Sequence, residues 1–373
     1  MWLYLLLAGV ALFWVGVFAR VRRSRADSRF KLGPDAPVAA ELPRLVVVIP
    51  ARDEARNIAE CIRAVRASDH PSLDVVVFDA ASSDGTADMA RLQGVRVLSG
   101  DGGPLPVGWK GKPWAIYRAM KEVSGDFVVF LDADVRMAPE ALSRLHSYLL
   151  RENIDLLSGF GRLLMESFWE KVIQPSVGGL IIAGNDLSIV NEHANTEKAI
   201  ANGQLILVRR SAYDAVGGHE AVKDDILDDI GLALAFRRAG MQARCLFVRE
   251  LFSCRMYTGF SELWQGWTKN LYPGMRHKPA AVVAVVLLVL IEFLSPYFVL
   301  FFAIRAHDGE LAVAATAVVL LIHAVRAYMD RLFQQDLPFG LLQPLGATLL
   351  LGLVLDSVRR TRAKSRTWKG RTY

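Results

Sequence analysis

Two carboxylates, Asp132 and Asp134, directly follow an apolar run in the middle of the chain. The run, residues 127–131, consists of five apolar residues, which is typical of a strand buried on both faces. In an open α/β sheet, ligands bind in the crevice beyond the carboxyl ends of the strands. Two acids one residue apart at such an end can share a hard divalent cation that bridges a diphosphate. The alternative is a solvated turn that caps the next helix, so the pair needs support from other residues.

Polar side chains also follow the first two predicted strands. They are Pro50, Arg52, Asp53 and Glu54 after the first strand and Asp79 at the end of the second. Carboxylates at these positions can accept hydrogen bonds from a nucleobase and from ribose hydroxyls. Helix capping is the alternative, and it is the preferred interpretation for Asp84. Because no Gly-rich phosphate loop follows the first strand, we expect neither a dinucleotide-binding fold nor a P-loop, and a bound diphosphate would need a metal ion.

One lysine and two acids further along could complete a site for a sugar diphosphate. Lys112 ends a Gly- and Pro-rich loop, residues 100–113, and could reach a diphosphate as a point charge. Asp228 and Asp229 lie in the first part of a predicted helix, and an acid there could deprotonate an acceptor hydroxyl. The alternatives are an exposed lysine in a loop and solvated acids that interact with the helix dipole.

A predicted amphipathic helix, residues 261–271, adds a third group of candidates. It carries Gln265, Trp267 and Lys269. The lysine could contact phosphate, and the indole could contact a sugar or an apolar face. Its richness in tryptophan also fits a helix at a membrane interface.

Strands and short helices alternate along the first half of the chain, which predicts βαβ units and a mostly parallel α/β sheet with helices on both faces. The predicted strands are residues 45–50, 74–79, 95–98, 127–131, 154–165 (at an edge) and 204–209. The predicted helices are residues 53–68, 87–93, 139–150, 168–190, 211–216 and 224–239.

The composition indicates a membrane protein. Of the 373 residues, 53% are hydrophobic, and the excess lies in residues 1–19 and 280–355. The net charge of +6 is concentrated beside these segments, in residues 20–25 and at the C-terminus, which favours anionic lipid head groups over nucleic acid. Three cysteines without metal-ligand spacing fit a reducing compartment.

The basic clusters also predict a membrane orientation. Residues 1–19 precede their basic cluster, so we expect an uncleaved anchor with its N-terminus outside. Further apolar segments are residues 281–303, 311–328 and 339–356. Four crossings would leave the basic tail outside, against the positive-inside rule. Either the last segment is re-entrant or lies along the membrane interface, or another segment does not cross. We expect a cytoplasmic tail.

Six motifs stand in one order along the chain: residues 50–54, 79–86, 132–134, 202–219, 228–229 and 265–269. This ordered set resembles the family 2 glycosyltransferases, which have a GT-A domain. Residues 105–112, 255–257, 265–270 and 368–373 narrow the resemblance to membrane-bound members that act on carotenoids and hopene-type lipids. The resemblance covers essentially the whole chain.

The resemblance implies inverting transfer of a sugar from a nucleotide-sugar donor, with Mg²⁺ or Mn²⁺ on the diphosphate. Asp134 matches the metal-binding acid, and Asp132 matches the acid near the ribose and the metal. Asp79 matches a nucleoside-binding acid. Asp229 matches the usual catalytic base, with Asp228 where many members have Glu. The implied donor-binding set is Pro50, Arg52, Asp53, Glu54, Asp79, Lys112, Asp132, Gln265, Trp267 and Lys269.

Three positions depart from the family pattern. Ala80 replaces a second acid after the second strand, and Asp53 replaces a common Asn, which removes a donor. The frequent Gln-x-x-Arg-Trp motif is absent at residues 265–270. The last departure argues against a polysaccharide synthase.

We therefore expect a multi-pass enzyme of the cytoplasmic membrane whose catalytic domain faces the cytoplasm. The expected donor is UDP-glucose, and the expected acceptor is a carotenoid- or hopanoid-type lipid. Alternatives are a polyprenyl-phosphate or glycerolipid acceptor, or a non-catalytic nucleotide-binding membrane scaffold. The expected divisions are residues 1–19 (anchor), 20–43 (basic segment and linker), 44–255 (GT-A domain), 256–279 (interfacial segment), 280–357 (transmembrane region) and 358–373 (basic tail).

Overall fold

The computed structural model describes residues 1–26, 28–363, 365, 367–368 and 371–372. Residue 27 of the predicted linker and part of the predicted basic tail therefore lie outside the described residues. The chain forms two compact units. The sheet unit comprises Arg29–Leu164 and Asn185–Met256, and the helical unit comprises Met1–Ser28, Met165–Gly184 and Tyr257–Tyr373.

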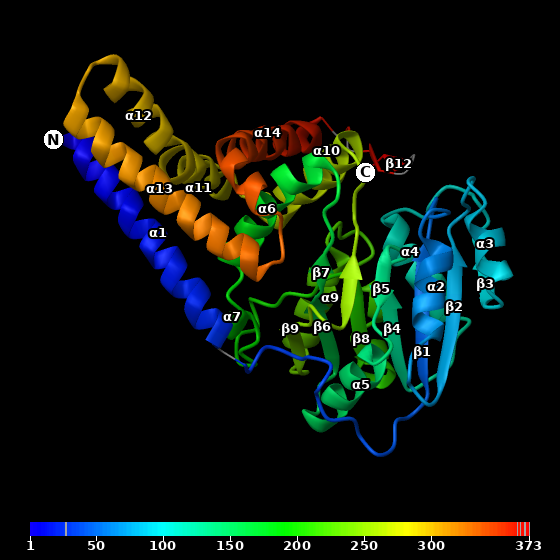
Figure 1. Ribbon diagram of the computed structural model, residues 1–373. Coiled ribbons are helices and arrows are strands. Elements are labelled where there is room, and N and C mark those ends of the chain that lie inside the picture. Colours follow the sequence, from blue (N-terminus) through cyan, green and yellow to red (C-terminus); the bar gives the residue numbers. More distant parts are fainter. Residues whose placement is uncertain (27, 364, 366, 369–370, 373) are drawn as a thin grey trace. The chain divides into compact units, whose positions relative to one another are not determined.

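The sheet unit contains a seven-stranded mixed sheet in the order β3-β2-β1-β4-β8-β6-β9 (Figure 1). Its strands are β1 (Leu45–Ala51), β2 (Leu73–Asp79), β3 (Arg96–Ser99), β4 (Phe127–Leu131), β6 (Leu156–Phe160), β8 (Leu205–Arg209) and β9 (Ala243–Phe247). Strand β8 is antiparallel to β4 and β6, and the other pairs are parallel. The expected α/β fold with a mostly parallel mixed sheet is confirmed.

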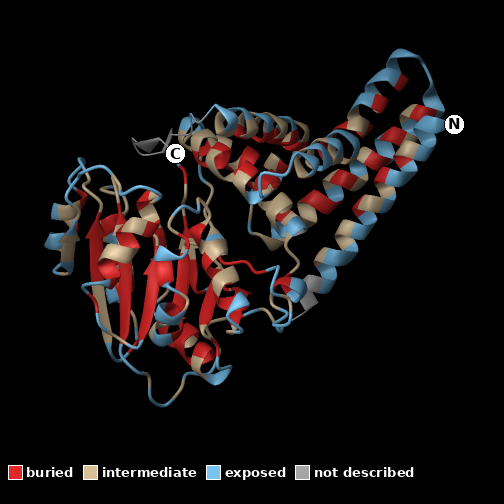
Figure 2. Cartoon of the chain, turned by 180° about the vertical axis from the view of Figure 1, so that it is seen from behind, coloured by how far each residue is buried: buried red, intermediate tan, exposed pale blue. Residues whose placement is uncertain are grey.

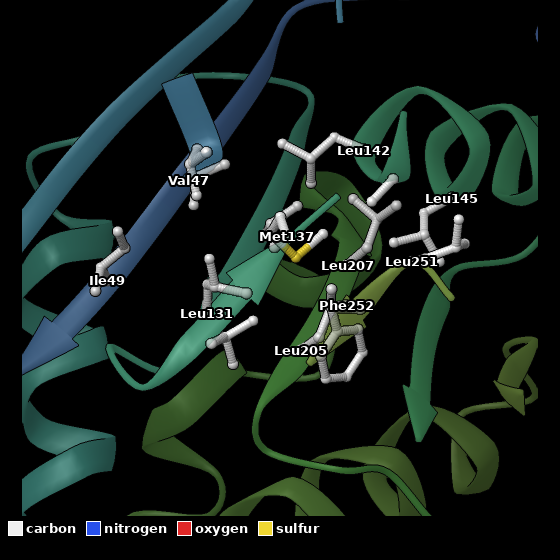
Figure 3. Packing of buried hydrophobic residues seen from close by; sticks show 14 of the residues in the cluster. Val47, Ile49, Leu131, Met137, Leu142, Leu145, Leu205, Leu207, Leu251 and Phe252 are labelled. Carbon is white, nitrogen blue, oxygen red and sulfur yellow. The ribbon is translucent and has the colours of Figure 1, made fainter. Parts of the chain in front are cut away.

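Helices pack on both faces of this sheet. They are α2 (Ile58–Arg66), α3 (Thr86–Leu92), α4 (Gly111–Met120), α5 (Ala141–Arg151), α7 (Leu187–Val190), α8 (Arg210–Ala215), η1 (Gly218–Glu220) and α9 (Asp228–Arg238). Side chains of β1 alternate between the two faces, as the pleat requires. Leu45, Val47 and Ile49 join the core under α2, α3 and α5. Figure 3 shows Val47 and Ile49 in this core. Val46 and Val48 join the core under α4, α8 and α9.

A small second sheet supports the turn after β4. It consists of β5 (Val135–Met137), β10 (Phe252–Cys254) and β7 (Arg162–Leu163), in the order β5-β10-β7. Cys254 lies opposite Val135 in the antiparallel pair, so β10 runs beside the turn that carries Asp132 and Asp134. Gly161 permits the close approach of Phe252, because a Cβ there would lie 2.3 Å from the ring.

The structure departs from the predicted elements in several places. The strand predicted at an edge is β6, which lies between β8 and β9. Strand β9 was not predicted. The loop predicted over residues 100–113 includes the first three residues of α4, and the rest of α4 was not predicted. The long helix predicted over residues 168–190 is two helices, with Asp186 capping the second. The helix predicted from Asp224 begins at Asp228.

The helical unit holds the apolar segments of the chain. Its helices are α1 (Trp2–Ala26), α6 (Phe168–Gly184), α10 (Phe260–Gly274), α11 (Pro279–Leu288), η2 (Val289–Leu294), α12 (Ser295–Arg305), α13 (Gly309–Leu332), η3 (Leu337–Leu342) and α14 (Gln343–Arg362). A two-residue β11 (Thr367–Trp368) pairs with β12 (Arg371–Thr372).

Among the described residues of this unit, four segments are long and apolar enough to cross a membrane: Trp2–Arg23, Pro279–Arg305, Gly309–Leu332 and Leu337–Arg362. Several large apolar side chains of these segments are exposed, with Leu12 at 74%, Val313 at 73% and Phe302 at 63%. Figure 2 shows exposed residues along the same helices. Such faces are stable where lipid rather than water surrounds them.

Candidate functional site

The loops after β1 and β2 are joined by hydrogen bonds. Arg52 Nη1 donates to the carbonyl of Ala80 at 2.8 Å, and the Asp53 N–H donates to Ser82 Oγ at 2.8 Å. Asp53 Oδ1 in turn accepts from the Ser83 N–H at 2.9 Å. The backbone φ of Asp53 is +50°, a region that non-glycine residues occupy when surrounding contacts hold them there. Arg52 and Asp53 therefore shape the loop.

Asp79, at the end of β2, has one carboxylate oxygen bonded and one oxygen available. Oδ2 accepts from the Ser82 N–H at 3.1 Å. Oδ1 is buried and has no hydrogen-bond partner among the described residues. A buried acceptor without a partner is costly, so a ligand N–H or O–H would stabilise it. Pro50 of β1 lies opposite Phe78 of β2, the residue that precedes Asp79.

Asp84 and Glu54 differ in what their carboxylates contact. Asp84 accepts from the N–H groups of Ala55 at 2.9 Å and Thr86 at 3.1 Å, which agrees with the capping role predicted for it. Glu54 accepts from Asn57 Nδ2 at 2.9 Å, and its charge also acts on Asp134. Glu54 thus connects the β1 loop to the acids after β4.

Lys112 links the first acid after β4 to the loop before β8. Its Nζ donates to Asp132 Oδ1 at 2.5 Å and to the Gly203 carbonyl at 2.9 Å. Burial acts to lower the pKa of this lysine, but the carboxylates of Asp132, Asp228 and Asp229 outweigh burial and raise it. Lys112 therefore stays positively charged. It lies beside Asp132 because it belongs to the first turn of α4, which begins at Gly111.

Asp134 is the least compensated acid of this group. Burial, followed by the charges of Asp132 and Glu54, raises the pKa of Asp134 to about 7, against a hydrogen bond from the Cys254 thiol. Its Oδ1 is buried without a hydrogen-bond partner among the described residues. A cation beside this oxygen would remove the cost of the charge.

A divalent cation fits these residues as a shared ligand. Within the described part of the chain, no three His, Cys, Asp or Glu side chains are placed to hold an ion by themselves. Mg²⁺ and ions like it are commonly bound by one or two carboxylates together with phosphate oxygens and water. The unpartnered oxygen of Asp134 and the adjacent Asp132 match that donor set.

Asp229 is held by the backbone on the other side of Gly203. Its Oδ2 accepts from the Gly203 N–H at 2.8 Å, and its Oδ1 accepts from the Ile230 N–H at 2.9 Å. Burial and the adjacent Asp228 raise the pKa of Asp229 to about 6, against Lys112 and the two backbone donors. A carboxylate with this pKa is ionised at neutral pH and can still accept a proton.

Asp228 points into the fold instead. Its Oδ2 lies 3.6 Å from His219 Nε2, and both side chains are buried. Burial acts to raise the pKa of Asp228, but His219 and Lys112 hold it below its usual value. The Tyr213 hydroxyl lies 2.8 Å from His219 Nδ1 and orients the imidazole. Asp228 is therefore a less available proton acceptor than Asp229.

The remaining candidates lie on α10 of the helical unit. Gln265 donates to Ser261 Oγ at 3.2 Å along the helix. Trp267 is buried with its ring 5.9 Å from that of Tyr257, and its indole N–H has no hydrogen-bond partner among the described residues. Lys269 is half-buried on the same helix. The sheet unit thus brings together the other candidates, and these three belong to the second unit.

Three residues of this site had no role predicted from the sequence: Gly203, His219 and Cys254. A Cβ at Gly203 would lie 3.0 Å from Lys112 Nζ and 3.1 Å from Asp229 Oδ2, so only glycine lets both groups approach. Gly203 and His219 stood in the motifs that carried the resemblance. Cys254 gave no signal, because only the pairing of β10 with β5 brings it to Asp134.

Comparisons with known proteins agree with this arrangement. A family model described as glycosyltransferase-like family 2 matches residues 43–269, more than half of the chain. The 4,4'-diaponeurosporenoate glycosyltransferase of Staphylococcus aureus strain MRSA252 is 29% identical over 258 residues, which cover 65% of each chain. The same enzyme of strain USA300 is 28% identical over 256 residues, with the same coverage. The chain thus spans 65% of the length of these relatives.

A solved structure shares the fold. The mannosyltransferase PcManGT from Pyrobaculum calidifontis, in complex with GDP-Man and Mn²⁺, aligns over 96% of this chain and 99% of its own. The TM-score is 0.52 at 17% identity, so the likeness concerns the fold alone. Together with the family match and the acids at the sheet edge, it confirms the expected GT-A fold. The chain belongs to glycosyltransferase family 2.

Proposed function

We propose that this protein transfers a sugar from a nucleotide-sugar donor to a membrane lipid, with inversion at the anomeric carbon. The observation that carries the proposal is the series of contacts from Asp132 through Lys112 and Gly203 to Asp229, at 2.5, 2.9 and 2.8 Å. It joins a group suited to a diphosphate with a group suited to proton removal. Such adjacency is what transfer from a sugar diphosphate to a hydroxyl requires.

The donor would bind along the carboxyl edge of β1, β2 and β4. Asp79 Oδ1, the unpartnered oxygen, is available to a donor group of the nucleoside. Asp134 and Asp132 would hold Mg²⁺ or Mn²⁺ on the diphosphate, and the metal would supply charge neutralisation of the leaving group. The expected donor is UDP-glucose. Bound GDP-Man in the Pyrobaculum structure supports a nucleotide sugar as the class.

Asp229 would act as the base for a hydroxyl acceptor. Its carboxylate takes the proton while the acceptor oxygen forms a bond to the anomeric carbon. The bond from that carbon to the diphosphate oxygen breaks, and its electron pair leaves with the nucleoside diphosphate. The two backbone N–H donors keep the carboxylate in one orientation, which lowers the entropic cost of the step. Lys112 provides a positive charge close to the departing phosphate.

The name of the staphylococcal relatives supports a carotenoid-type acceptor. The sequence resemblance also supports a hopanoid-type lipid. Four helices of spanning length support a multi-pass protein in the cytoplasmic membrane, with the sheet unit facing the cytoplasm. Gln265, Trp267 and Lys269 of α10 stay proposed donor-binding residues on the basis of the sequence resemblance.

Comparison of lipid extracts by mass spectrometry tests the proposal. Strains with the gene deleted, with the wild-type gene, and with Asp134→Ala or Asp229→Ala are compared. We expect one lipid class to lose a hexose-sized mass in the deletion strain and in both variants. No change in any glycolipid would overturn the lipid acceptor, and full activity of both variants would overturn the assigned roles. Wild-type protein that binds UDP with Mn²⁺ yet transfers nothing would favour a non-catalytic scaffold.

A further inference from the structure

A partly exposed aromatic patch lies around the start of α4. It comprises Val107, Trp109, Trp114, Tyr117, Arg118 and Lys121. The centroids of the three rings lie 4.7–5.7 Å apart. Val107, next to them, is 99% exposed. The patch is therefore a surface feature built mainly from residues that water does not favour.

The other face of α4 supplies the core contact, so packing does not account for the patch. Ala115, Ile116 and Ala119 are buried against the sheet. The three rings stand outside that core cluster and are half-exposed. A helix covered by solvent would carry charged or polar residues on this outward face. Here it carries indole and phenol rings.

Two cations lie over these rings. The guanidinium of Arg118 is 5.5 Å from the centroid of Trp114, and Lys121 Nζ is 4.9 Å from that of Tyr117. Half-exposed Trp and Tyr with adjacent Arg and Lys are the composition that proteins present at the boundary between lipid head groups and acyl chains. The cations match anionic head groups, and the apolar tip of Val107 matches the layer beneath them.

The patch also lies at the edge of the sheet that bears the candidate site. The Gly100 N–H donates to the carbonyl of Asp79, at the end of β2, at 2.7 Å. The Lys110 N–H donates to the Lys223 carbonyl at 2.7 Å, which ties the loop to the segment before Asp228. The next residues begin α4 and place Lys112 on Asp132. One short stretch of backbone thus connects the aromatic patch with the candidate site.

We propose that the aromatic patch docks on the surface of an anionic bilayer, with Val107 inserted at the level of the acyl chains. Docking presents the carboxyl edge of β1, β2 and β4 to the membrane. A further consequence, which rests on the proposed function, is that an acceptor lipid reaches Asp229 without leaving the bilayer. The docking itself needs no catalysis.

Site-specific fluorescence on the full-length protein in vesicles tests the docking. Val107→Cys is labelled with an environment-sensitive dye, and Leu92→Cys is the matched control. Leu92, at the end of α3, is another exposed apolar residue of the sheet unit, at 83%. Labelling is selective because the native Cys61, Cys245 and Cys254 are buried. Vesicles of phosphatidylcholine with phosphatidylglycerol are compared with vesicles of phosphatidylcholine alone.

We expect the dye at position 107 to emit at shorter wavelength and to be quenched by spin-labelled acyl chains, whereas the dye at 92 stays accessible to iodide in water. Anionic lipid should strengthen the effect. Replacing Arg118 and Lys121 by Gln should weaken docking by about 25-fold, since each cation near an anionic surface contributes about 1 kcal/mol.

Equal exposure of both dyes to iodide would overturn the proposal, as would a shift at position 107 that persists in detergent without any bilayer and so indicates a protein contact. Because the donor is omitted, this readout is independent of transfer. Docking without any glycolipid product would contradict the proposed function alone. As a functional check, Val107→Asp should lower transfer to lipid in vesicles while the affinity for UDP stays unchanged.

Discussion

Two pairs of acids, one after β4 and one at the start of α9, are arranged in the same way. In each pair one carboxylate has a basic partner and the other does not. Asp132 contacts Lys112 at 2.5 Å, and Asp228 lies 3.6 Å from His219. Their companions carry the raised values, with a pKa of about 7 for Asp134 and about 6 for Asp229. Environment thus divides two chemically identical side chains into a supported and a reactive member.

The two pairs differ in what the reactive member lacks. Asp134 has a buried oxygen without a hydrogen-bond partner among the described residues, and a cation can bind to this oxygen. Asp229 has backbone donors on both oxygens, which hold its orientation and leave lone pairs for a proton. One arrangement suits metal binding and the other suits proton transfer. Lys112 is common to both, because its charge acts on the acids of each pair.

The largest expected effect is the loss of the metal ligand. Asp134→Ala should reduce sugar transfer by at least about 10³-fold, since a metal on the leaving group contributes several kcal/mol to the transition state. Mn²⁺ binding in the presence of UDP, followed by electron paramagnetic resonance, should be lost as well. Asp214→Ala, which removes an exposed acid that pairs with Arg210, serves as the control. Unchanged Mn²⁺ binding would show that the pair after β4 does not hold the metal.

Asp229→Asn separates the two classes of acceptor. With a hydroxyl acceptor we expect kcat to fall by about 10²–10³-fold while binding of UDP is retained, because a general base contributes that much. A carboxylic acid acceptor is already ionised at neutral pH, so kcat with that acceptor should fall by less than about tenfold. Steady-state kinetics on both acceptors measure the difference. A large loss of UDP affinity would instead show that Asp229 binds the donor.

Removal of the shared lysine should affect both pairs at once. Lys112→Met should raise the KM for the donor and lower kcat, with a combined loss of about 10²-fold, because a charge-assisted contact to phosphate is lost and two acids become uncompensated. Lys198→Met is the matched control, since that lysine is exposed and belongs neither to the site nor to the aromatic patch. If Lys112→Met behaves like the control, the contact series has no role in transfer.

The pH dependence follows from Asp229. Its pKa is raised to about 6, so the carboxylate becomes protonated as the pH falls through that value. For a hydroxyl acceptor, kcat should therefore be constant above pH 7 and fall about tenfold for each pH unit below 6. Initial rates at saturating donor and metal test this. A flat profile down to pH 5 would rule out proton transfer to this group as a limiting step.

The smallest effect on transfer is expected from the partner of Asp228. His219→Gln removes the buried imidazole that lies 3.6 Å from the Asp228 carboxylate, which should lower the free energy of unfolding by about 1–3 kcal/mol. Transfer by the folded fraction should fall by less than tenfold. Chemical denaturation and kinetics on the same preparation give both values. If the variant keeps its stability but loses transfer, His219 and Asp228 take part in the reaction.

Local sequence was sufficient for the strands that carry the acids. Residues 45–51, 73–79 and 127–131 are mainly apolar runs with polar residues at or just after their ends, and each is a strand in the sheet. Local sequence was insufficient for α4 and β9. The Gly and Pro residues around Lys112 indicated a loop, and β9 becomes a strand through its parallel pairing with β6. Tertiary contacts outweigh local propensity at such places.

The sequence by itself determined the α/β class, the family and the identity of the acids, because these depend on patterns along the chain. It left Asp228 and Asp229 open as candidates for the base, and it gave Cys254 and Gly203 no role. The tertiary structure favours Asp229 over Asp228, since the burial of Asp228 beside His219 and the hydrogen bond from Gly203 to Asp229 arise only when β8, α9 and η1 pack together. A pKa depends on surroundings in three dimensions, and neighbours in sequence supply only part of them.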